Sequence, residues 1–411
     1  MSSWDCKSFK YLKGLGVDYV WYTGIPRHAS GKDFVKGDSG SPYAVSDWKD
    51  VNPYLADNPD ERMAEFEQLV ARTHHAKLKC IIDFIPNHVA KDYAGDVPHM
   101  DRCDYDWTDT LKVDWNDVRT GPAMLEILRL WASKGVDGFR CDMVELVPQK
   151  ALKELISSIK EEYPGLIFIA EVYGKENYRS YLDEVGFDLL YDKSGYYDKL
   201  RSITCSDTSA RELTWHWQWL GNMQGRMLNF LENHDEQRAA SSGFAGSPQE
   251  TLAAAAFSML FNTASFMIYF GQEAGENAEE DKGGRTSIFN WCEPETIGRL
   301  GRHIENGKGL RKNEEKILAV YKKLTGYAKL PEFASGNTWD LCYCQSDDSG
   351  FNPDRHFAFL RYSGKSAYLV LCNFSEETAT ADLYIPAEPL GKEFRLQMSA
   401  KPRNFSITKM L

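Results

Sequence analysis

Four short polar clusters carry side chains that could do acid–base or nucleophilic chemistry. Each cluster ends an apolar run, and stretches long enough for a helix separate them. The clusters are Asp-Phe-Ile-Pro-Asn-His at 83–88, Gly-Phe-Arg-Cys-Asp at 138–142, Ile-Ala-Glu at 169–171 and Asn-His-Asp at 233–235. In a β/α barrel the carboxyl ends of the strands converge on one face, where such enzymes do their chemistry. The pattern therefore predicts one site built from residues far apart in the sequence.

Asp142 and Glu171 are the two acids that cleavage of a glycosidic bond would need. Retaining hydrolysis uses two carboxyl groups about 5 Å apart, one as nucleophile and one as acid/base. Adjacent strands lie about 4.8 Å apart, so acids that end successive strands can meet this spacing. Arg140 comes two residues before Asp142 and should point to the same face, where it could hold Asp142 ionised. An isolated acid would more often cap a helix, but four clusters in register favour a site.

Asp235 ends a further strand and could stabilise the positive charge of an oxocarbenium-like transition state or bind sugar hydroxyls. His88 and His234 could donate hydrogen bonds to those hydroxyls. A mixed metal site that also includes Asp83 is the alternative interpretation. No short spacing of two histidines supports it, so a metal is not assigned.

Alternating apolar runs and helical patterns predict a parallel sheet with right-handed crossovers. Seven runs are expected to be strands, at 18–23, 80–85, 137–141, 166–171, 187–191, 227–231 and 266–270. Helical patterns occupy 9–16, 61–77, 122–133, 148–162 and 249–262. In the third of these, Pro122 suits the first turn and Gly135 the exit.

The expected fold class is α/β, a TIM (β/α)8 barrel followed by an antiparallel β sandwich. A closed barrel needs eight strands, so we expect the first one to be missing from this chain. Short β-rich runs at 338–344, 356–362, 367–374, 379–385 and 393–396 predict the sandwich. The expected domains are the catalytic barrel at 1–330 and the sandwich at 331–411.

The composition is that of a soluble globular protein, with 411 residues, 43% hydrophobic and 26% charged. A net charge of −12 argues against nucleic acid or an anionic membrane as partner. No run approaches the roughly eighteen apolar residues of a membrane span. Nine irregularly spaced cysteines and an opening without a signal-peptide pattern predict reduced thiols and a cytoplasmic location, although the N-terminus could be incomplete.

Taken together and in order, the clusters resemble the four motif regions of the α-amylase family of glycoside hydrolases. The segment 41–48 resembles the family segment whose tyrosine, here Tyr43, stacks on the sugar at the cleavage point. The resemblance covers about 9–330, with a fainter match at 369–375. It implies Asp142 as nucleophile, Glu171 as general acid/base and Asp235 as transition-state stabiliser. It also implies that Tyr43, His88, Arg140 and His234 bind substrate.

The sequence departs from the family pattern at two places. The family usually inserts a sizeable domain that helps hold a structural calcium, but here the insert is very short, at 89–111. Asn87 matches a family calcium ligand, yet partner acids are hard to place, so no cofactor is expected and calcium is left open. Many family amylases carry Lys-His three and four residues after the nucleophile. This chain has Glu145 and Leu146 there, which should alter acceptor binding.

The resemblance implies a retaining hydrolase that cleaves α-glucosidic bonds of starch-type glucans or maltooligosaccharides. A transglycosylase of the same family is the alternative, because both reactions share the covalent intermediate. A non-catalytic amylase-like binding protein and a metal-dependent barrel lyase or aldolase are the other classes. The preference for α-1,4 or α-1,6 bonds, the substrate chain length and the oligomeric state are not set by the sequence.

Overall fold

The computed structural model describes residue 1 and residues 5–30, 40–278 and 294–411. The chain forms two compact units, of which the first ends at Tyr191 and the second begins at Asp192. This division falls inside the segment expected to form the barrel. The boundary expected between residues 330 and 331 therefore stays a prediction, and each unit is described by itself.

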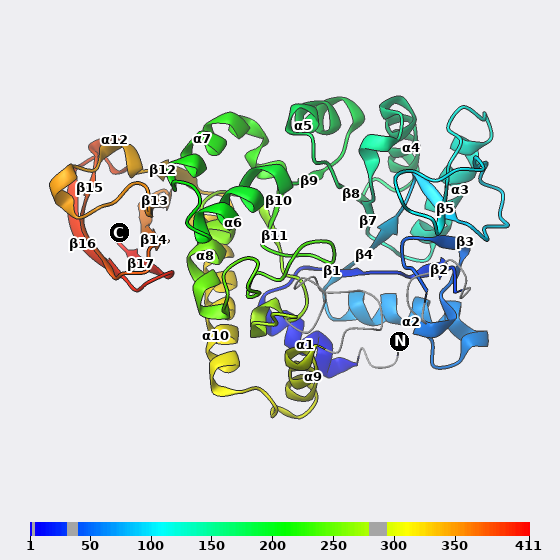
Figure 1. The fold of residues 1–411 in the computed structure, drawn as a ribbon, viewed down its shortest axis with the longest axis horizontal. Helices are drawn as coiled ribbons and strands as arrows, with labels where there is room; N and C mark the ends of the chain where they lie inside the picture. The colour runs from blue at the N-terminus through cyan, green and yellow to red at the C-terminus, as the bar shows by residue number, and fades with distance from the viewer. Residues whose placement is uncertain (2–4, 31–39, 279–293) are drawn as a thin grey trace. The chain divides into compact units, whose positions relative to one another are not determined.

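The first unit is built on five parallel strands in the order β1-β4-β7-β8-β9 (Figure 1). They are β1 (Tyr19–Tyr22), β4 (Lys79–Phe84), β7 (Gly138–Cys141), β8 (Ile167–Ala170) and β9 (Leu189–Tyr191). These strands lie within five of the predicted runs, or begin one residue before the run in the case of β4. β7 is buried along its whole length, as a strand of a parallel sheet with both faces covered should be.

One helix precedes the first strand of this unit, and the others lie between or after its parallel strands. They are α1 (Cys6–Leu15), α2 (Arg62–His75), α3 (Thr120–Ser133), α4 (Gln149–Glu162) and α5 (Tyr178–Ser180). α2 lies within the helical pattern at 61–77 and buries one face through Phe66, Leu69, Val70 and Thr73. Pro122 lies in the first turn of α3, and Gly135 adopts a left-handed φ of 90° after its end, as the sequence indicates.

Two antiparallel pairs add to the first unit. β2 (Pro26–His28) pairs with β3 (Val45–Val51), and β5 (His88–Ala90) pairs with β6 (Thr110–Lys112). The second pair closes the base of the short insert expected at 89–111. It places His88 opposite Lys112. The two ends of the insert are therefore paired next to a predicted site residue.

The second unit contains two further parallel strands, β10 (Met227–Phe230) and β11 (Ser265–Met267). Its helices are α6 (Asp198–Thr204), α7 (Arg211–Leu220), α8 (Leu252–Leu260), α9 (Glu295–Asn306), α10 (Lys312–Ala328), α11 (Pro331–Ala334) and α12 (Ala387–Leu390). Every residue of α8 is buried. With β10 and β11, all seven predicted strand segments are strands within the described part of the chain. The strand predicted at 266–270 ends earlier, at Met267.

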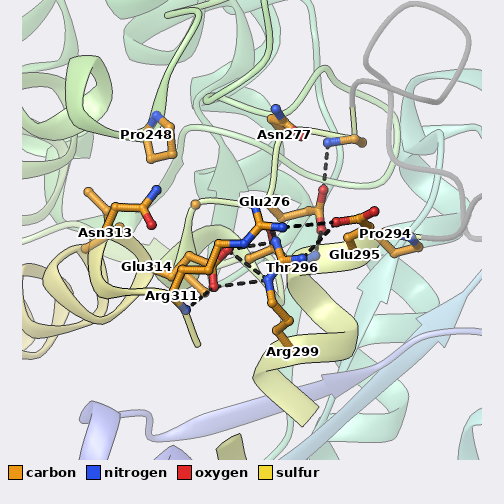
Figure 2. Close-up of a pocket in the computed structure, with 14 residues that line it drawn as sticks. Pro248, Glu276, Asn277, Pro294, Glu295, Thr296, Arg299, Arg311, Asn313 and Glu314 are labelled. Atoms are coloured by element: carbon orange, nitrogen blue, oxygen red, sulfur yellow. Dashed lines mark hydrogen bonds and ion pairs between the residues drawn. The ribbon is translucent and has the colours of Figure 1, made fainter. Parts of the chain in front are cut away.

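A hollow of about 360 Å³ lies in the second unit beside α9 and α10 (Figure 2). The charged side chains that line the hollow form ion pairs and hydrogen bonds with residues of the surrounding helices. Arg299 binds Glu314 at 2.7 Å and Glu295 at 2.8 Å, and Glu276 accepts from the backbone N–H of Thr296 at the start of α9. No predicted site residue lines this hollow. We therefore regard it as a feature of helix packing.

The chain ends in two antiparallel sheets that share one apolar core. One sheet has the order β12-β13-β14-β17 and the other is β15-β16. The strands are β12 (Asn337–Asp340), β13 (His356–Ser363), β14 (Ser366–Asn373), β15 (Ala379–Ile385), β16 (Phe394–Ala400) and β17 (Phe405–Lys409). Leu360 and Leu371 from the first sheet and Leu383 from the second lie in the same buried cluster.

Two details of this region correct the sequence-based expectation. The strand predicted at 338–344 ends at Asp340, and Cys342–Cys344 forms a 3₁₀ turn because the Asp340 carboxylate accepts from the Cys342 N–H at 2.7 Å. β17 was not predicted. Its sequence alternates apolar Phe405 and Ile407 with polar residues, but the run has only five residues and none of them is fully buried.

Within the described residues, no helix is both long and apolar enough to cross a membrane. The described cysteines are free thiols. Burial raises the thiol pKa of Cys80, Cys141, Cys342 and Cys372. The cytoplasmic location stays a prediction.

Candidate active site

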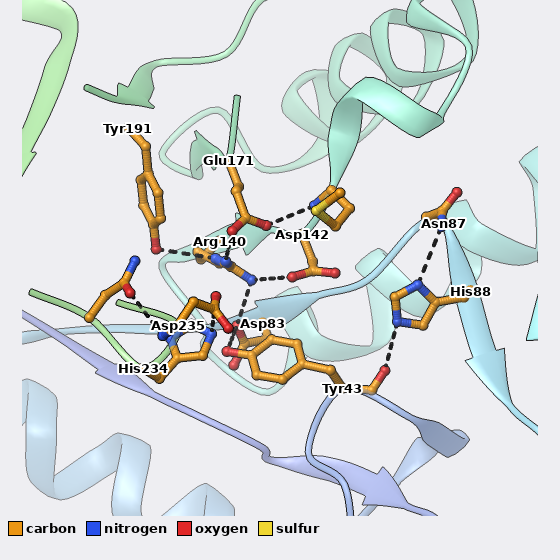
Figure 3. A network of polar contacts seen from close by, with 12 residues as sticks. Tyr43, Asp83, Asn87, His88, Arg140, Asp142, Glu171, Tyr191, His234 and Asp235 are labelled. Atoms are coloured by element: carbon orange, nitrogen blue, oxygen red, sulfur yellow. Dashed lines mark hydrogen bonds and ion pairs between the residues drawn. The ribbon is translucent and has the colours of Figure 1, made fainter. Parts of the chain in front are cut away.

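One buried guanidinium group contacts the predicted acids of the first unit (Figure 3). Arg140 is fully buried on β7. Its Nη1 donates to Oδ1 of Asp142 at 2.6 Å, and its Nη2 lies 2.9 Å from Oε1 of Glu171. The arginine therefore holds both acids that were predicted to form the catalytic pair.

Strand register explains why these two acids are neighbours. β7 and β8 pair in parallel with Cys141 opposite Ala170, and the Glu171 N–H continues the ladder by donating to the Cys141 carbonyl at 3.1 Å. Asp142 and Glu171 are the next residues on the two strands. Adjacent strands lie about 4.8 Å apart. This register supports the carboxyl spacing that a retaining pair needs.

The two acids differ in exposure. The side chain of Asp142 is 9% exposed, whereas that of Glu171 is 2% exposed. Glu171 also accepts from the Tyr173 hydroxyl at 2.8 Å and from the Met143 N–H at 3.0 Å. Asp142 is thus the acid that a ligand reaches more easily, and Glu171 is the one that the protein holds in place.

A third acid and three aromatic rings complete the surroundings of Arg140. Asp83 lies 3.7 Å from its Nη1, and the Tyr43 hydroxyl donates to Asp83 at 3.3 Å. The rings of Trp21, Tyr43 and Tyr191 lie 5.2, 5.4 and 5.5 Å from the guanidinium carbon. Such rings stabilise a buried cation through their negative faces.

The charge of Arg140 is secure in this environment. Burial alone would lower the pKa of Arg140, but the negative charges around it, Glu171 first and Asp142 among them, raise it well above its ordinary value. Burial raises the pKa of the Tyr191 hydroxyl, so Tyr191 stays neutral beside the arginine and accepts from its Nε at 3.2 Å. Arg140 therefore stays positively charged beside the two acids.

Backbone strain occurs directly after Asp142. Met143 has a φ of 45°, in the left-handed region that residues with a side chain seldom adopt. This conformation lets its N–H reach Oε2 of Glu171. Strain of this kind persists where the surrounding structure over-determines it, and it is typical of functional sites.

His88 joins the site through the segment that carries Tyr43. Its Nε2 lies 3.0 Å from the Tyr43 carbonyl oxygen and must carry the hydrogen, while the Asn87 amide faces Nδ1 at 3.4 Å. Burial lowers the pKa of His88 to about 4, so the ring is neutral. The histidine thus positions Tyr43 in this structure, and direct binding of sugar by His88 stays a prediction.

The side-chain amide of Asn87 lies beside an ion pair, to which it donates through Asp104 at 2.9 Å. Ca²⁺ takes six to eight oxygen ligands, several of them carboxylates. Oδ1 of Asn87 is buried without a hydrogen-bond partner among the described residues, but the nearby Asp104 binds the Lys112 ammonium through both of its oxygens, at 2.9 and 2.8 Å. The described residues contain no group of three His, Cys, Asp or Glu that could hold a metal. The expectation of no cofactor, with calcium left open, stays a prediction.

The fourth cluster forms a turn in the second unit. His234 Nε2 lies 3.0 Å from Asp235, whose side chain is 42% exposed, and the Asn233 side chain accepts from the Asp235 N–H at 2.9 Å. A fully buried ion pair between Glu232 and Arg238, at 2.6 Å, holds the base of this turn. The turn therefore presents one accessible carboxylate beside a buried histidine.

Sequence reasoning missed several residues of the site. Tyr191 ends a predicted strand, so its position at a carboxyl end was the available signal. Tyr173 follows Glu171 by two residues and had no signal of its own. Glu145 is hydrogen-bonded to the loop after β8, and its expected effect on acceptor binding stays a prediction. Glu232 and Arg238 gave no signal, because their pairing depends on the turn between them.

The family described as Alpha amylase, catalytic domain, matches residues 6–110 and 102–318. The chain belongs to the α-amylase catalytic-domain family.

Known relatives share this family at low identity. An α-amylase of Saccharomycopsis fibuligera is 22% identical over 319 residues, which are 69% of this chain and 61% of the relative. A cyclomaltodextrin glucanotransferase of Paenibacillus macerans is 23% identical over 318 residues, 64% of this chain and 42% of the relative. The chain thus spans less than two thirds of the length of these two proteins.

A solved structure supports the fold. A maltogenic α-amylase from Thermotoga neapolitana superposes with a TM-score of 0.70 at 23% identity, covering 98% of this chain and 90% of that one. The chain therefore has the α/β barrel fold of this family, with a C-terminal antiparallel β domain, as the sequence predicts.

Proposed function

We propose that this protein hydrolyses α-glucosidic bonds of starch-type glucans or maltooligosaccharides with retention of anomeric configuration. Asp142 is the nucleophile, Glu171 the general acid/base and Asp235 the stabiliser of the transition state. Tyr43, His88, Arg140 and His234 contact or orient the sugar. The observation that carries the proposal is the contact of one buried arginine with both Asp142 and Glu171.

The reaction has two displacements. The Asp142 carboxylate attacks the anomeric carbon, the glycosidic C–O bond breaks, and Glu171 gives its proton to the leaving oxygen. Glu171 then takes a proton from water, whose oxygen attacks the same carbon and releases Asp142. The higher exposure of Asp142 supports the first role, and the donors around Glu171 support the orientation that proton transfer needs.

The experiment is incubation with soluble starch and a maltooligosaccharide ladder, with the products separated by chromatography. The natural protein should release shorter glucans and reducing ends. Asp142→Asn should lower kcat at least about a thousandfold, as removal of a nucleophile does. Asp382→Asn, at an exposed position of β15, is the matched control and should keep full activity. Unchanged activity of Asp142→Asn would rule out the mechanism.

Transfer to a sugar acceptor is the second candidate, because one relative is a cyclomaltodextrin glucanotransferase. Both reactions pass through the same glycosyl–Asp142 intermediate. The product ladder separates them, since a transferase forms oligosaccharides longer than the substrate. A predominance of longer products would replace hydrolysis by transfer.

We propose that the reaction needs no cofactor and that calcium is not required. The support is the Lys112 ammonium, which neutralises Asp104 beside Asn87. The proposed partner is the glucan substrate. Nucleic acid is not expected to bind, because the net charge is −12.

A further inference from the structure

Hydrogen bonds to Glu145 join the loop after β7 to the loop after β8. Glu145 lies in the 3₁₀ turn Val144–Leu146, three residues after Asp142. Its Oε2 accepts from the Tyr173 N–H at 2.7 Å, and its Oε1 accepts from the Gly174 N–H at 3.1 Å. The Asn177 side-chain amide donates to the same Oε1 at 2.8 Å. One carboxylate therefore satisfies the start of the 3₁₀ turn Lys175–Asn177, which has no cap of its own.

Further contacts make the two loops one assembly. The Tyr181 hydroxyl donates to the Val144 carbonyl at 3.2 Å, and Gln149 donates to Ser180 at 3.3 Å. Gly174 allows the central contact, because a Cβ at this position would lie 2.7 Å from Oε1 of Glu145. The close approach of the carboxylate thus depends on a glycine.

The assembly leads directly to the proposed acid/base. Tyr173, whose backbone is bound by Glu145, places its own hydroxyl 2.8 Å from Oε1 of Glu171. Oε2 of the same acid accepts from Met143, two residues before Glu145. Each oxygen of Glu171 therefore has a donor from one of the two joined loops.

We propose that Glu145 is a positioning residue of the reaction, which fixes the backbone of Tyr173 so that the tyrosine hydroxyl orients Glu171. This inference rests on the proposed role of Glu171. It explains why an acid occupies this position near the nucleophile. The backbone N–H groups of the neighbouring loop are the partners of its charge, and a lysine there could not accept from them.

A purely structural anchor is the competing role, and the pH profile of kcat/KM distinguishes the two. A hydroxyl that donates to the Glu171 carboxylate favours its ionised form. Tyr173→Phe removes that hydroxyl, so Glu171 should keep its proton to higher pH. The alkaline limb should then move up by about one pH unit, the size expected for a hydrogen bond to a charged group.

Glu145→Gln should move the same limb in the same direction by about half a unit, because the shift acts through Tyr173. It should also lower kcat about tenfold with little change in KM, since orientation of a catalytic group affects the chemical step. In the double variant the Glu145→Gln substitution should add almost nothing to Tyr173→Phe. Glu176→Gln, at an exposed position in the same 3₁₀ turn, is the control and should match the natural protein.

Two results would overturn the proposal. One is a Glu145→Gln variant that loses thermal stability while its alkaline limb stays in place. The other is full additivity of the two substitutions. Gly174→Ala offers a second route if Glu145→Gln does not fold, since it keeps the acid and displaces its carboxylate, and it should shift the limb as Glu145→Gln does.

Hydrogen–deuterium exchange separates this inference from the proposed function. In Glu145→Gln the amides of Tyr173 and Gly174 should exchange at least about tenfold faster than in the natural protein, whatever the substrate is. Unchanged exchange would show that Glu145 does not hold the loop. If the natural protein is inactive on α-glucans while Glu145→Gln still shows the faster exchange, the proposed function is refuted. The role of Glu145 in holding the loop would stand.

Discussion

The carboxylates of Asp142 and Glu171 bind the two terminal nitrogens of a single buried guanidinium group, at 2.6 and 2.9 Å. One cation thus counters two acids whose mutual repulsion would otherwise oppose their burial. It also fixes the direction in which each carboxylate faces, and this common support is the basis of the proposed chemistry.

Replacing Arg140 should therefore damage folding as well as activity. Arg140→Met leaves the neighbouring acids in the interior without their cation, which should lower the free energy of unfolding by about 3–5 kcal/mol. Arg129→Met is the matched control, because Arg129 forms its ion pairs at 37% exposure, where such pairs contribute less than about 1 kcal/mol. Urea denaturation measures both. Equal losses in the two variants would contradict the central role of Arg140.

The ring of Tyr43, rather than its hydroxyl, should carry its contribution to substrate binding. Tyr43→Phe loses one 3.3 Å hydrogen bond to Asp83 but keeps the ring, so kcat/KM should fall no more than about threefold. Tyr43→Ala removes the stacking surface and should lower kcat/KM by about tenfold to a hundredfold. Steady-state kinetics on one maltooligosaccharide would test this. A larger loss in Tyr43→Phe than in Tyr43→Ala would show the opposite.

Stability should decrease as the solution becomes acidic because two buried histidines are neutral. Burial lowers the pKa of His88 and of His356 to about 4, and Nδ1 of His356 accepts the Asn352 N–H at 2.9 Å, which requires an unprotonated nitrogen. Since the unfolded histidine has a pKa of about 6.5, the unfolded state binds more protons between pH 6.5 and 4. Stability is thus complete above pH 6.5 and is lost as the pH falls toward 4, by up to about 3 kcal/mol for each histidine.

Measuring the free energy of unfolding as a function of pH tests whether stability falls as the pH falls. His356→Gln should flatten the slope between pH 6.5 and 4, whereas His75→Gln, at an exposed position of α2, should leave it unchanged. A slope that His356→Gln does not alter would refute the assignment to this histidine.

Removal of calcium should not change the melting temperature. The Lys112 ammonium binds both oxygens of Asp104 in the place where a metal would need that carboxylate. With excess EDTA we therefore expect a shift of less than about 1 °C, because a ligand that does not bind cannot stabilise. A fall of several degrees that Ca²⁺ restores and Mg²⁺ does not would contradict the proposal.

The positions of the strands and the acids at their ends could be predicted from the sequence, because apolar runs followed by polar residues are a local signal. Asp142 and Glu171 follow β7 and β8 as expected, and parallel register brings them onto Arg140. The short insert was equally visible as a spacing. The structure adds that the antiparallel pair β5 and β6 joins the two ends of this insert.

Contacts that depend on loop conformation could not be predicted. Glu145 binds backbone N–H groups of a loop about thirty residues further on, and a backbone donor has no sequence signature. The strained φ of Met143 is likewise not encoded by a glycine or an asparagine. β17 is a five-residue run without a buried residue, and it forms through its ladder with β14.

The most direct test of the central claim is peptide mass spectrometry of a Glu171→Gln variant incubated with an α-maltosyl fluoride. Fluoride leaves without acid help, and the missing acid/base slows hydrolysis, so the glycosyl–enzyme should accumulate. The account predicts a maltosyl ester on the peptide that contains Asp142, and its disappearance in the Asp142→Asn, Glu171→Gln double variant. A sugar attached to a different residue, or a natural protein that cleaves the fluoride with inversion and no label, would contradict it.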